Sequence, residues 1–257
     1  MGTENIKLSY KNLINGDIPP YVMRFIKAVG KTINSFDMIR ADENVLLAVS
    51  GGKDSLSLAL ALSLRRKWLP VNYNLKAVLI DWTEHPIEEN FKPKLEEYFD
   101  LLDIDFKIIN QSQFSLNSVK DFNCYLCSRN RRRILFELAN EEKYKIIAMG
   151  HHLDDLVETT MMNLFFRSDF STMNPIQEFF NGQLYIIRPL INIHESLIKR
   201  LSDVYDLPVV KPVCPYDAVN VRADLKPIIR DLSHIDKRIR EHVFNAHDFS
   251  HCSINRG

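Results

Sequence analysis

The sequence lacks the features of membrane and secreted proteins. No apolar run in its 257 residues reaches the roughly 18 residues that a membrane span needs. Its first residues, MGTENIKLSY, contain no apolar signal-peptide core. Internal repeats and low-complexity tracts are absent as well. We therefore expect a globular, cytoplasmic protein that has no membrane partner.

The sequence also lacks an excess of charge of either sign. It contains 33 Lys and Arg residues and 33 Asp and Glu residues. A chain without net charge has no global attraction for nucleic acid, so any RNA site must be a local basic patch. Hydrophobic residues make up 46% of the chain, an ordinary share, and the length suits one α/β domain with a sizeable core.

Cysteine is scarce, with only Cys124, Cys127, Cys214 and Cys252. In a reducing cytosol such thiols are more often ligands or redox groups than disulfides. Cys124 and Cys127 form a C-x-x-C pair before an expected helix, which fits a zinc site, a redox pair, half of an iron–sulfur site or two buried thiols. With Cys214, three cysteines suit a [4Fe–4S] cluster with one open iron, whereas a structural zinc would need a fourth ligand. We expect Cys252, near the C-terminus, to be a bystander.

Residues 50–55, SGGKDS, stand between two apolar runs and predict a strand, a tight glycine turn and a helix. Gly51 and Gly52 lack a Cβ atom, so the backbone can turn sharply and approach a ligand closely. Backbone N–H groups at a helix N-terminus, together with the charge of Lys53, favour a phosphate. The spacing differs from that of the Walker A loop and of G-x-G-x-x-G. A plain glycine turn is the alternative, but the six consecutive residues favour a phosphate site.

Alternating apolar strands and helices predict an α/β fold, a parallel Rossmann-like sheet with helices on both faces. We expect strands at residues 45–49, 75–81, 104–110, 145–150 and 184–188, and helices at 22–36, 56–64, 86–102, 129–142, 153–166, 194–206 and 225–244. Residues 1–40 are expected to be an N-terminal segment and helix packed on a domain of residues 41–257. A mobile loop is expected at residues 167–177.

Several residues suited to ligand binding fall where the expected strands end, namely Ser50, Asp81, Asn110 and Gly150. Ligands of parallel sheets bind beyond the carboxyl ends of the strands, so we expect these residues to line one crevice. After Gly150 the sequence continues with His151, His152, Leu153, Asp154 and Asp155, which open a helix. These side chains could organise Mg²⁺ and phosphates, or the two carboxylates could simply complement the helix dipole.

Basic residues form two clusters. They are Arg129, Arg131, Arg132 and Arg133 after the C-x-x-C pair, and Lys237, Arg238 and Arg240 near the C-terminus. The first four cannot share one helix face, so some should point to solvent and could contact a polyanion. From charge alone, a solvated helix face is the commoner interpretation.

Five of these patterns occur in the order seen in the tRNA 2-thiocytidine synthetases, a family of PP-loop ATP pyrophosphatases. The patterns are SGGKDS, CYLCSRNRRR, GHHLDDLVET, IRPL and Cys214, a cysteine after a short expected strand. The sequence resembles this family over residues 21 to 231, and the combination is far more specific than SGGKDS alone. The resemblance implies a Rossmann-like sandwich of the adenine nucleotide alpha hydrolase (HUP) type.

The resemblance implies an ATP-dependent tRNA sulfurtransferase. Such an enzyme adenylates the C2 oxygen of the cytidine at tRNA position 32, releasing pyrophosphate, and sulfur then displaces AMP to leave 2-thiocytidine. The implied partners are tRNA and a sulfur donor, either a cysteine desulfurase or sulfide. The apolar face of the N-terminal helix would allow a homodimer, but packing of that face on the core explains it equally well.

The resemblance also assigns roles to individual residues. ATP would be bound by Ser50, Gly51, Gly52, Lys53, Asp54, Ser55, Asp81, Gly150 and His151. The catalytic residues would be Lys53, Asp54, Asp154 and Asp155, with Asp54 also near Mg²⁺. A [4Fe–4S] cluster would be held by Cys124, Cys127 and Cys214, and the candidates for RNA contact are Arg129, Arg131 and Arg132.

The sequence departs from the family pattern in two places. Cys214 is followed by Pro-Tyr-Asp where members often carry a second cysteine, and residues 167–183 are unlike the glycine-rich version. The alternatives are a thiolase that makes 2-thiouridine, a lysidine synthetase, an adenylyl-sulfate reductase and a non-catalytic nucleotide-binding iron–sulfur sensor. Residues 1–40 contain no cysteine or histidine, which argues against the zinc-binding termini usual in the 2-thiouridine enzymes.

Overall fold

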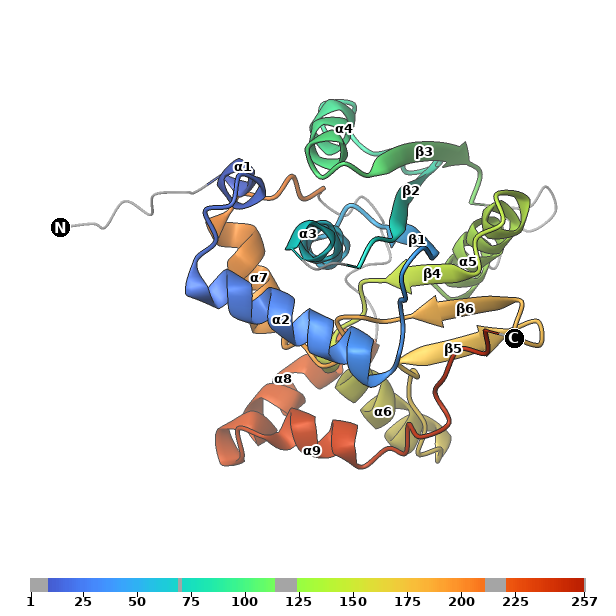
Figure 1. Cartoon of the computed structure of the whole chain (residues 1–257). Coiled ribbons are helices and arrows are strands. Elements are labelled where there is room, and N and C mark those ends of the chain that lie inside the picture. Colours follow the sequence, from blue (N-terminus) through green and yellow to red (C-terminus); the bar gives the residue numbers. More distant parts are fainter. Residues whose placement is uncertain (1–8, 69–70, 114–123, 211–220, 257) are drawn as a thin grey trace.

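The computed structural model describes residues 9–68, 71–113, 124–210 and 221–256. Six strands form one sheet in the order β3-β2-β1-β4-β6-β5 (Figure 1). Their bounds are β1 (Asn44–Val49), β2 (Asn74–Trp82), β3 (Asp105–Gln111), β4 (Ile146–Met149), β5 (Ile176–Phe179) and β6 (Leu184–Ile187). All neighbours pair in parallel except the edge strand β5, which is antiparallel to β6. The predicted α/β fold is confirmed.

Helices cover both faces of the sheet, as predicted. The described helices are α1 (Tyr10–Ile14), α2 (Pro20–Ser35), α3 (Lys53–Trp68), α4 (Lys92–Leu101), α5 (Cys124–Glu141), α6 (Leu153–Arg167), α7 (Glu195–Val204), α8 (Val221–Ile235) and α9 (Ile239–Asn245). Helices α2, α3, α4 and α7 share one apolar cluster, and α5 packs on the opposite face of the sheet (Figure 1). Helices α6, α8 and α9 form a separate group. Within the described part of the chain, no helix combines the length and apolarity needed to cross a bilayer.

Alternation along the strands builds the two apolar layers. Val45 and Leu47 of β1 pack in the layer that contains α2 and α3, whereas Leu46 packs in the layer under α5. Successive side chains of a strand point to opposite faces, so a strand covered on both sides is a continuous apolar run in the sequence. The buried side chains that α5 contributes to its layer, Ile134, Leu135, Leu138 and Ala139, come from its C-terminal half, and Cys127 in its first turn packs against the same layer while partly buried.

The apolar face of α2 is buried within the chain. Phe25, Val29 and Ile33 are at most 1% exposed and belong to the same cluster as residues of β1 and β2. Pro20 opens this helix, at a position where its missing N–H group costs no hydrogen bond. The face that suggested a homodimer therefore already has a partner in its own chain, and the boundary at residue 40 stays a prediction.

Several boundaries expected from the sequence are wrong. Helix α4 begins six residues later than expected, because Pro93 fits the first turn of a helix and the N–H of Ile87 donates instead to Asp81 Oδ1 at 2.8 Å. Helix α5 begins at Cys124, so the C-x-x-C pair forms its first turn instead of preceding it. The expected C-terminal helix is split into α8 and α9, and residues 176–179 form β5 rather than part of a loop.

Candidate active site

The strand order places the two glycine-containing motifs together. The chain runs from β1 outward to β2 and β3, then continues with β4 on the other side of β1. Ligands of such sheets bind at this reversal, beyond the carboxyl ends of the strands. Ser50 follows β1 and Gly150 follows β4. A Cβ atom on Gly150 would lie only 2.9 Å from the backbone nitrogen of Ser55, so a residue larger than glycine would displace the start of α3.

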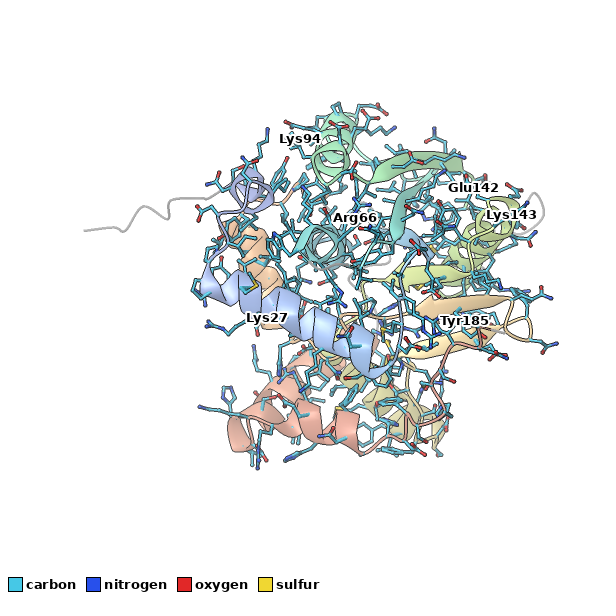
Figure 2. The ribbon with its side chains drawn as sticks, in the orientation of Figure 1. Lys27, Arg66, Lys94, Glu142, Lys143 and Tyr185 are labelled. Atoms are coloured by element: carbon cyan, nitrogen blue, oxygen red, sulfur yellow. The ribbon has the colours of Figure 1, made fainter. Side chains whose placement is uncertain are left out.

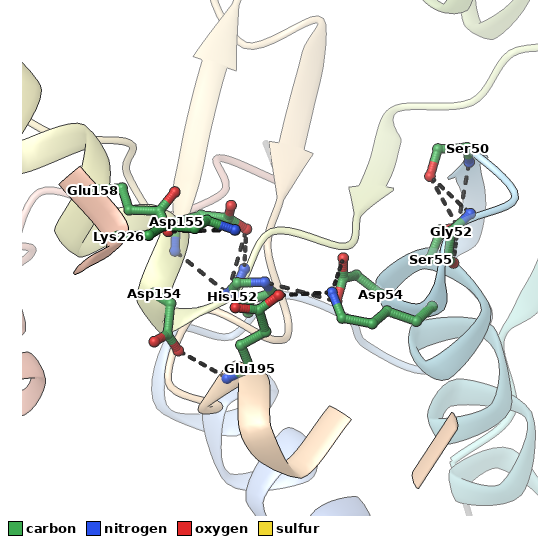
Figure 3. Close-up of polar contacts among 11 residues, drawn as sticks. Ser50, Gly52, Asp54, Ser55, His152, Asp154, Asp155, Glu158, Glu195 and Lys226 are labelled. Carbon is green, nitrogen blue, oxygen red and sulfur yellow. Dashed lines mark hydrogen bonds and ion pairs between the residues drawn. The ribbon is translucent and has the colours of Figure 1, made fainter. Parts of the chain in front are cut away.

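Serine hydroxyls and a glycine turn shape the loop of residues 50–55 (Figure 3). Gly51 has a φ of +79°, a conformation that side chains disfavour. Ser50 N donates to Ser55 Oγ at 3.3 Å, Gly52 N donates to Ser50 Oγ at 3.3 Å, and Ser55 Oγ donates to the Gly52 carbonyl at 2.9 Å. Helix α3 starts at Lys53, so the positive end of its dipole lies at the loop. This arrangement is suited to a phosphate group.

Lys53 lies between two carboxylates, those of Asp54 and Glu195. Its Nζ is 3.0 Å from Asp54 Oδ1 and 2.9 Å from Glu195 Oε1. Burial lowers the pKa of Lys53, but the hydrogen bond with Glu195 and the charge of Asp54 outweigh it, so the pKa is raised above its ordinary value. Lys53 is therefore a cation at neutral pH. Sequence analysis did not identify Glu195, which enters the site from the start of α7, because no local pattern marks it.

His152 and Asp155 cap the N-terminus of α6. The backbone N–H of His152 donates to Asp155 Oδ2 at 3.0 Å, and the N–H of Asp155 donates to His152 Nδ1 at 3.4 Å. This reciprocal pair is a capping box with histidine in the usual serine position. His152 Nε2 also lies 3.7 Å from Asp54 Oδ1, so the cap reaches the phosphate loop (Figure 3).

Asp154 is engaged by other elements of the chain rather than pointing freely into the site. Its Oδ2 accepts from the backbone N–H of Glu195 at 2.8 Å, and its Oδ1 pairs with the guanidinium of Arg240. Burial raises the pKa of Asp154, but these two donors outweigh burial and lower it. One helical turn further, burial raises the pKa of Glu158, whose Oε1 is 3.8 Å from Lys226 Nζ (Figure 3).

His151 and Arg188 follow the carboxyl ends of β4 and β6. The Nδ1 atom of His151 is buried and has no hydrogen-bond partner among the described residues. Burial and, to a lesser degree, the charge of Arg188 lower the pKa of His151 to about 4. Arg188 is 6% exposed, and burial lowers its pKa to about 10. The site thus contains a neutral imidazole and a buried guanidinium.

Asp81, expected to contact ATP, is 2% exposed and already has two partners. Its Oδ1 accepts from the N–H of Ile87 at 2.8 Å, and its Oδ2 lies 3.1 Å from Lys92 Nζ. Asp81 pairs in register with Asn110, so both residues stand on neighbouring strands near their carboxyl ends, as expected.

The cysteines are described only in part. Cys127 lies in the first turn of α5, where its Sγ accepts from Gln113 Nε2 at 3.0 Å. Cys124 opens the same helix, its side chain lies outside the described set, and Cys214 lies outside the described residues altogether. Among the residues that are described, no group of three or more His, Cys, Asp or Glu residues could hold a metal ion. Cys252 is buried, and burial raises the pKa of its thiol.

The candidate RNA contacts project from α5 in different directions. The guanidinium of Arg131 lies 5.6 Å from the centre of the Trp82 ring, against the sheet. Arg129 and Arg132 are exposed, and neither forms an ion pair with a described residue. Arg133 is neutralised by Glu137, one turn along the helix, at 2.7 Å.

Comparison with known proteins agrees with this geometry. A PP-loop domain model matches residues 23–211. A tRNA-cytidine(32) 2-sulfurtransferase of Paraburkholderia phytofirmans is 33% identical over 230 residues, covering 87% of this chain and 67% of that protein, and one of Burkholderia lata is 32% identical over 233 residues, covering 87% and 68%. The structure of the U34-tRNA thiolase NcsA of Methanococcus maripaludis, which contains a [4Fe–4S] cluster, matches with a TM-score of 0.72 and 25% identity, covering 88% of this chain and 77% of that one. The chain belongs to the PP-loop ATP pyrophosphatase superfamily and, within it, to the family of tRNA-cytidine(32) 2-sulfurtransferases, the tRNA 2-thiocytidine synthetases.

Proposed function

We propose that this protein is an ATP-dependent tRNA sulfurtransferase that converts the cytidine at tRNA position 32 to 2-thiocytidine. The observation that carries the proposal is the junction of the phosphate loop with the start of α6, where Gly150 packs against Ser55 and His152 reaches Asp54. Relatives that cover most of the chain are named for this reaction.

The residues of the junction suit the first half of the reaction. The N–H groups at the start of α3 and the charge of Lys53 would bind the β and γ phosphates of ATP, with Lys53 leaving Glu195 to do so. The C2 oxygen of cytidine attacks the α phosphorus, and pyrophosphate leaves. A carbonyl oxygen is a poor leaving group until it is a phosphate ester. Sulfide then attacks C2, and AMP departs with the oxygen.

Asp54 is the proposed contact for Mg²⁺. The absence of a three-ligand group among the described residues is compatible with this, because Mg²⁺ usually takes one or two carboxylates and completes its shell with substrate phosphates and water. We propose that Asp155 and Asp154 hold other residues of the site in place and do not contact the reacting atoms. Asp155 fixes His152 against Asp54, and Asp154 fixes the start of α7, which carries Glu195.

Cys124, Cys127 and Cys214 are the proposed ligands of a [4Fe–4S] cluster. Cys124 and Cys127 are three residues apart in one helical turn, so they share a face of α5, and the helix N-terminus favours thiolates. Such a cluster, when bound, would offer an open iron to a sulfur species. The related U34-tRNA thiolase contains a cluster of this type. The sulfur donor is proposed to be sulfide or a cysteine desulfurase. Helix α2 offers no free apolar face to a homodimer, because its apolar residues are buried in the core of the same chain.

The decisive experiment is mass spectrometry of tRNA nucleosides from a strain lacking the gene, complemented with variants. Wild-type protein and the control Lys27→Ala, an exposed lysine of α2, should restore 2-thiocytidine. Lys53→Ala should reduce it by about 100-fold or more, because a preorganised charge at the phosphates is lost. Cys127→Ala should also fail, and its purified protein should have lost most of its iron.

Each other outcome has a definite meaning. Loss of 2-thiouridine instead of 2-thiocytidine would change the base and keep the chemistry. Unchanged thiolated nucleosides in the deletion strain would refute the proposed substrate. Normal activity of Lys53→Ala would refute the phosphate site.

A further inference from the structure

A groove of about 1200 Å³ follows the outer side of α5, away from the phosphate loop. It extends from Gln113 and Tyr125, beside Cys127, to Tyr144 and Lys145 past the other end of the helix. Its second wall is the turn between β5 and β6. Helix α5, which forms one wall, has 18 residues and is therefore about 27 Å long. None of the chemistry proposed above occupies it.

The charge of the groove is strongly positive although the chain as a whole is neutral. Its charged lining residues are Arg129, Arg132, Arg133, Lys143, Lys145 and Glu137. Glu137 is paired with Arg133, and the other four cations form no ion pair with a described residue. Lys143 lies at the end of α5, on the opposite side from Lys27 in the view of Figure 2. This concentration of charge is the local basic patch that a neutral RNA-binding protein requires.

Aromatic rings accompany these charges. Tyr125 is 73% exposed and Phe180 is 60% exposed, and both line the groove. The ring of Phe180 is supported by Phe136 in an edge-on contact, with centroids 5.7 Å apart and planes at 83°. Exposed aromatic faces beside unpaired cations are the combination on which bases of single-stranded nucleic acid stack while the cations bind the phosphates.

Resting on the proposed function, we propose that this groove binds the single-stranded RNA next to the reacting nucleotide, with a base stacked on Phe180 and phosphates on Arg129 and Arg132. The groove ends at Gln113, which donates to Cys127 Sγ, so a strand lying in it is led to the C-x-x-C pair. A folded anticodon loop offers such a strand without melting of a duplex.

The test is the affinity of purified protein for a fluorescein-labelled anticodon stem–loop RNA, measured by anisotropy at several salt concentrations. Phe180→Ala should weaken binding by about 10-fold or more, and Phe180→Trp should restore it, because stacking on one aromatic side chain is worth that much. Arg129→Ala with Arg132→Ala should make the plot of log affinity against log salt shallower by about 1.4, at about 0.7 per phosphate contact.

Matched controls come from the same chain. Phe166 on α6 is 64% exposed and Lys27 on α2 is exposed, so Phe166→Ala and Lys27→Ala should bind as the wild type does. Groove variants that bind RNA with wild-type affinity and salt dependence would refute the groove and leave the proposed function standing. A wild type that binds no RNA would refute both. A change of oligomeric state in Phe180→Ala would assign the groove to a second copy of the chain and refute the RNA assignment.

Discussion

His151 keeps a neutral ring at physiological pH. It sits where β4 ends, its Nδ1 is buried without a partner among the described residues, and burial together with the charge of Arg188 lowers its pKa to about 4. A neutral imidazole can accept or donate one hydrogen bond without adding charge next to a nucleotide. The predicted role of His151 in binding ATP stays a prediction, and a neutral ring suits a contact with an uncharged base better than one with a phosphate.

The lowered pKa of His151 makes the stability of the protein depend on pH. In the unfolded chain, histidine titrates near 6.5. The unfolded state therefore gains a proton first as the pH falls, so the contribution of His151 to stability is complete above about 6.5 and is lost as the pH falls toward 4. Histidine-selective NMR should give a midpoint near 4 for His151. A midpoint of 6 or above would show that the ring is not buried as the structure describes.

How well the site could be predicted depended on where its residues stand in the sequence. Residues 50–55 are contiguous, so their spacing alone indicated a turn against a helix N-terminus. Glu195 and Arg240 act on Lys53 and Asp154 from distant helices. No local pattern marks Glu195, and the basic cluster that contains Arg240 indicated a solvated face or a polyanion contact, not its pairing with Asp154. Their roles depend on packing, which a single sequence does not contain.

The side chain of Arg240 links α9 to α6. Arg240 pairs with Asp154 and donates from Nη1 to Ser233 Oγ of α8 at 2.6 Å, so one guanidinium links three helices. The side chains of Asp154 and Arg240 are 12% and 19% exposed. Removing one partner of such a pair leaves a charge with little access to water.

Arg240→Ala should therefore lower the free energy of unfolding by about 3 kcal/mol, as measured by urea denaturation near pH 7. The matched change Arg238→Ala, whose side chain is 75% exposed, should cost less than about 0.5 kcal/mol. The lowered pKa of Asp154 means that its stabilisation is lost as the pH falls through that pKa, so the two variants should converge in acid. Equal stability of both variants near pH 7 would contradict the link.

Helix α2 was predicted well because its apolar residues recur at helical spacing, whereas α3 is buried all round, and its apolar run at residues 56–64 predicted only the middle of the helix. Strand β5 was missed because it is only four residues long and its pairing with β6 is antiparallel, which the surrounding parallel units do not suggest. Phe180, Asn181 and Gly182, which connect β5 to β6, have positive φ values.

The tail, residues 246–256 after α9, contacts residues from earlier parts of the chain. Arg256 contacts Glu43 at 2.6 Å and Asp37 at 3.1 Å, and the N–H of Asn255 donates to the hydroxyl of Tyr185, labelled in Figure 2. These contacts join the tail to the segment between α2 and β1 and to strand β6.

Arg256→Ala should lower the free energy of unfolding by about 2 kcal/mol, because hydrogen bonds between charged, partly buried groups are lost. Arg40 also pairs with Asp37 but is 58% exposed, so Arg40→Ala should cost less than about 1 kcal/mol. Thermal unfolding of both variants measures the difference. If Arg40→Ala cost as much as Arg256→Ala, the tail would not contribute to holding the domain.

Helix α5 has more apolar burial at its C-terminal end, because its buried side chains begin at Ile134 and the described side chains from residue 125 to 133 are exposed or only partly buried. Local opening of a segment costs little when few apolar contacts hold it, so the amides of this first half should exchange with deuterium much faster than those of α3, without unfolding the domain. The end of α5 that carries the C-x-x-C pair is then held by fewer contacts, among them the packing of Cys127, its hydrogen bond from Gln113 and the contact of Arg131 with Trp82. A ligand bound by the C-x-x-C pair would therefore stabilise the first half of α5, where few apolar contacts do so.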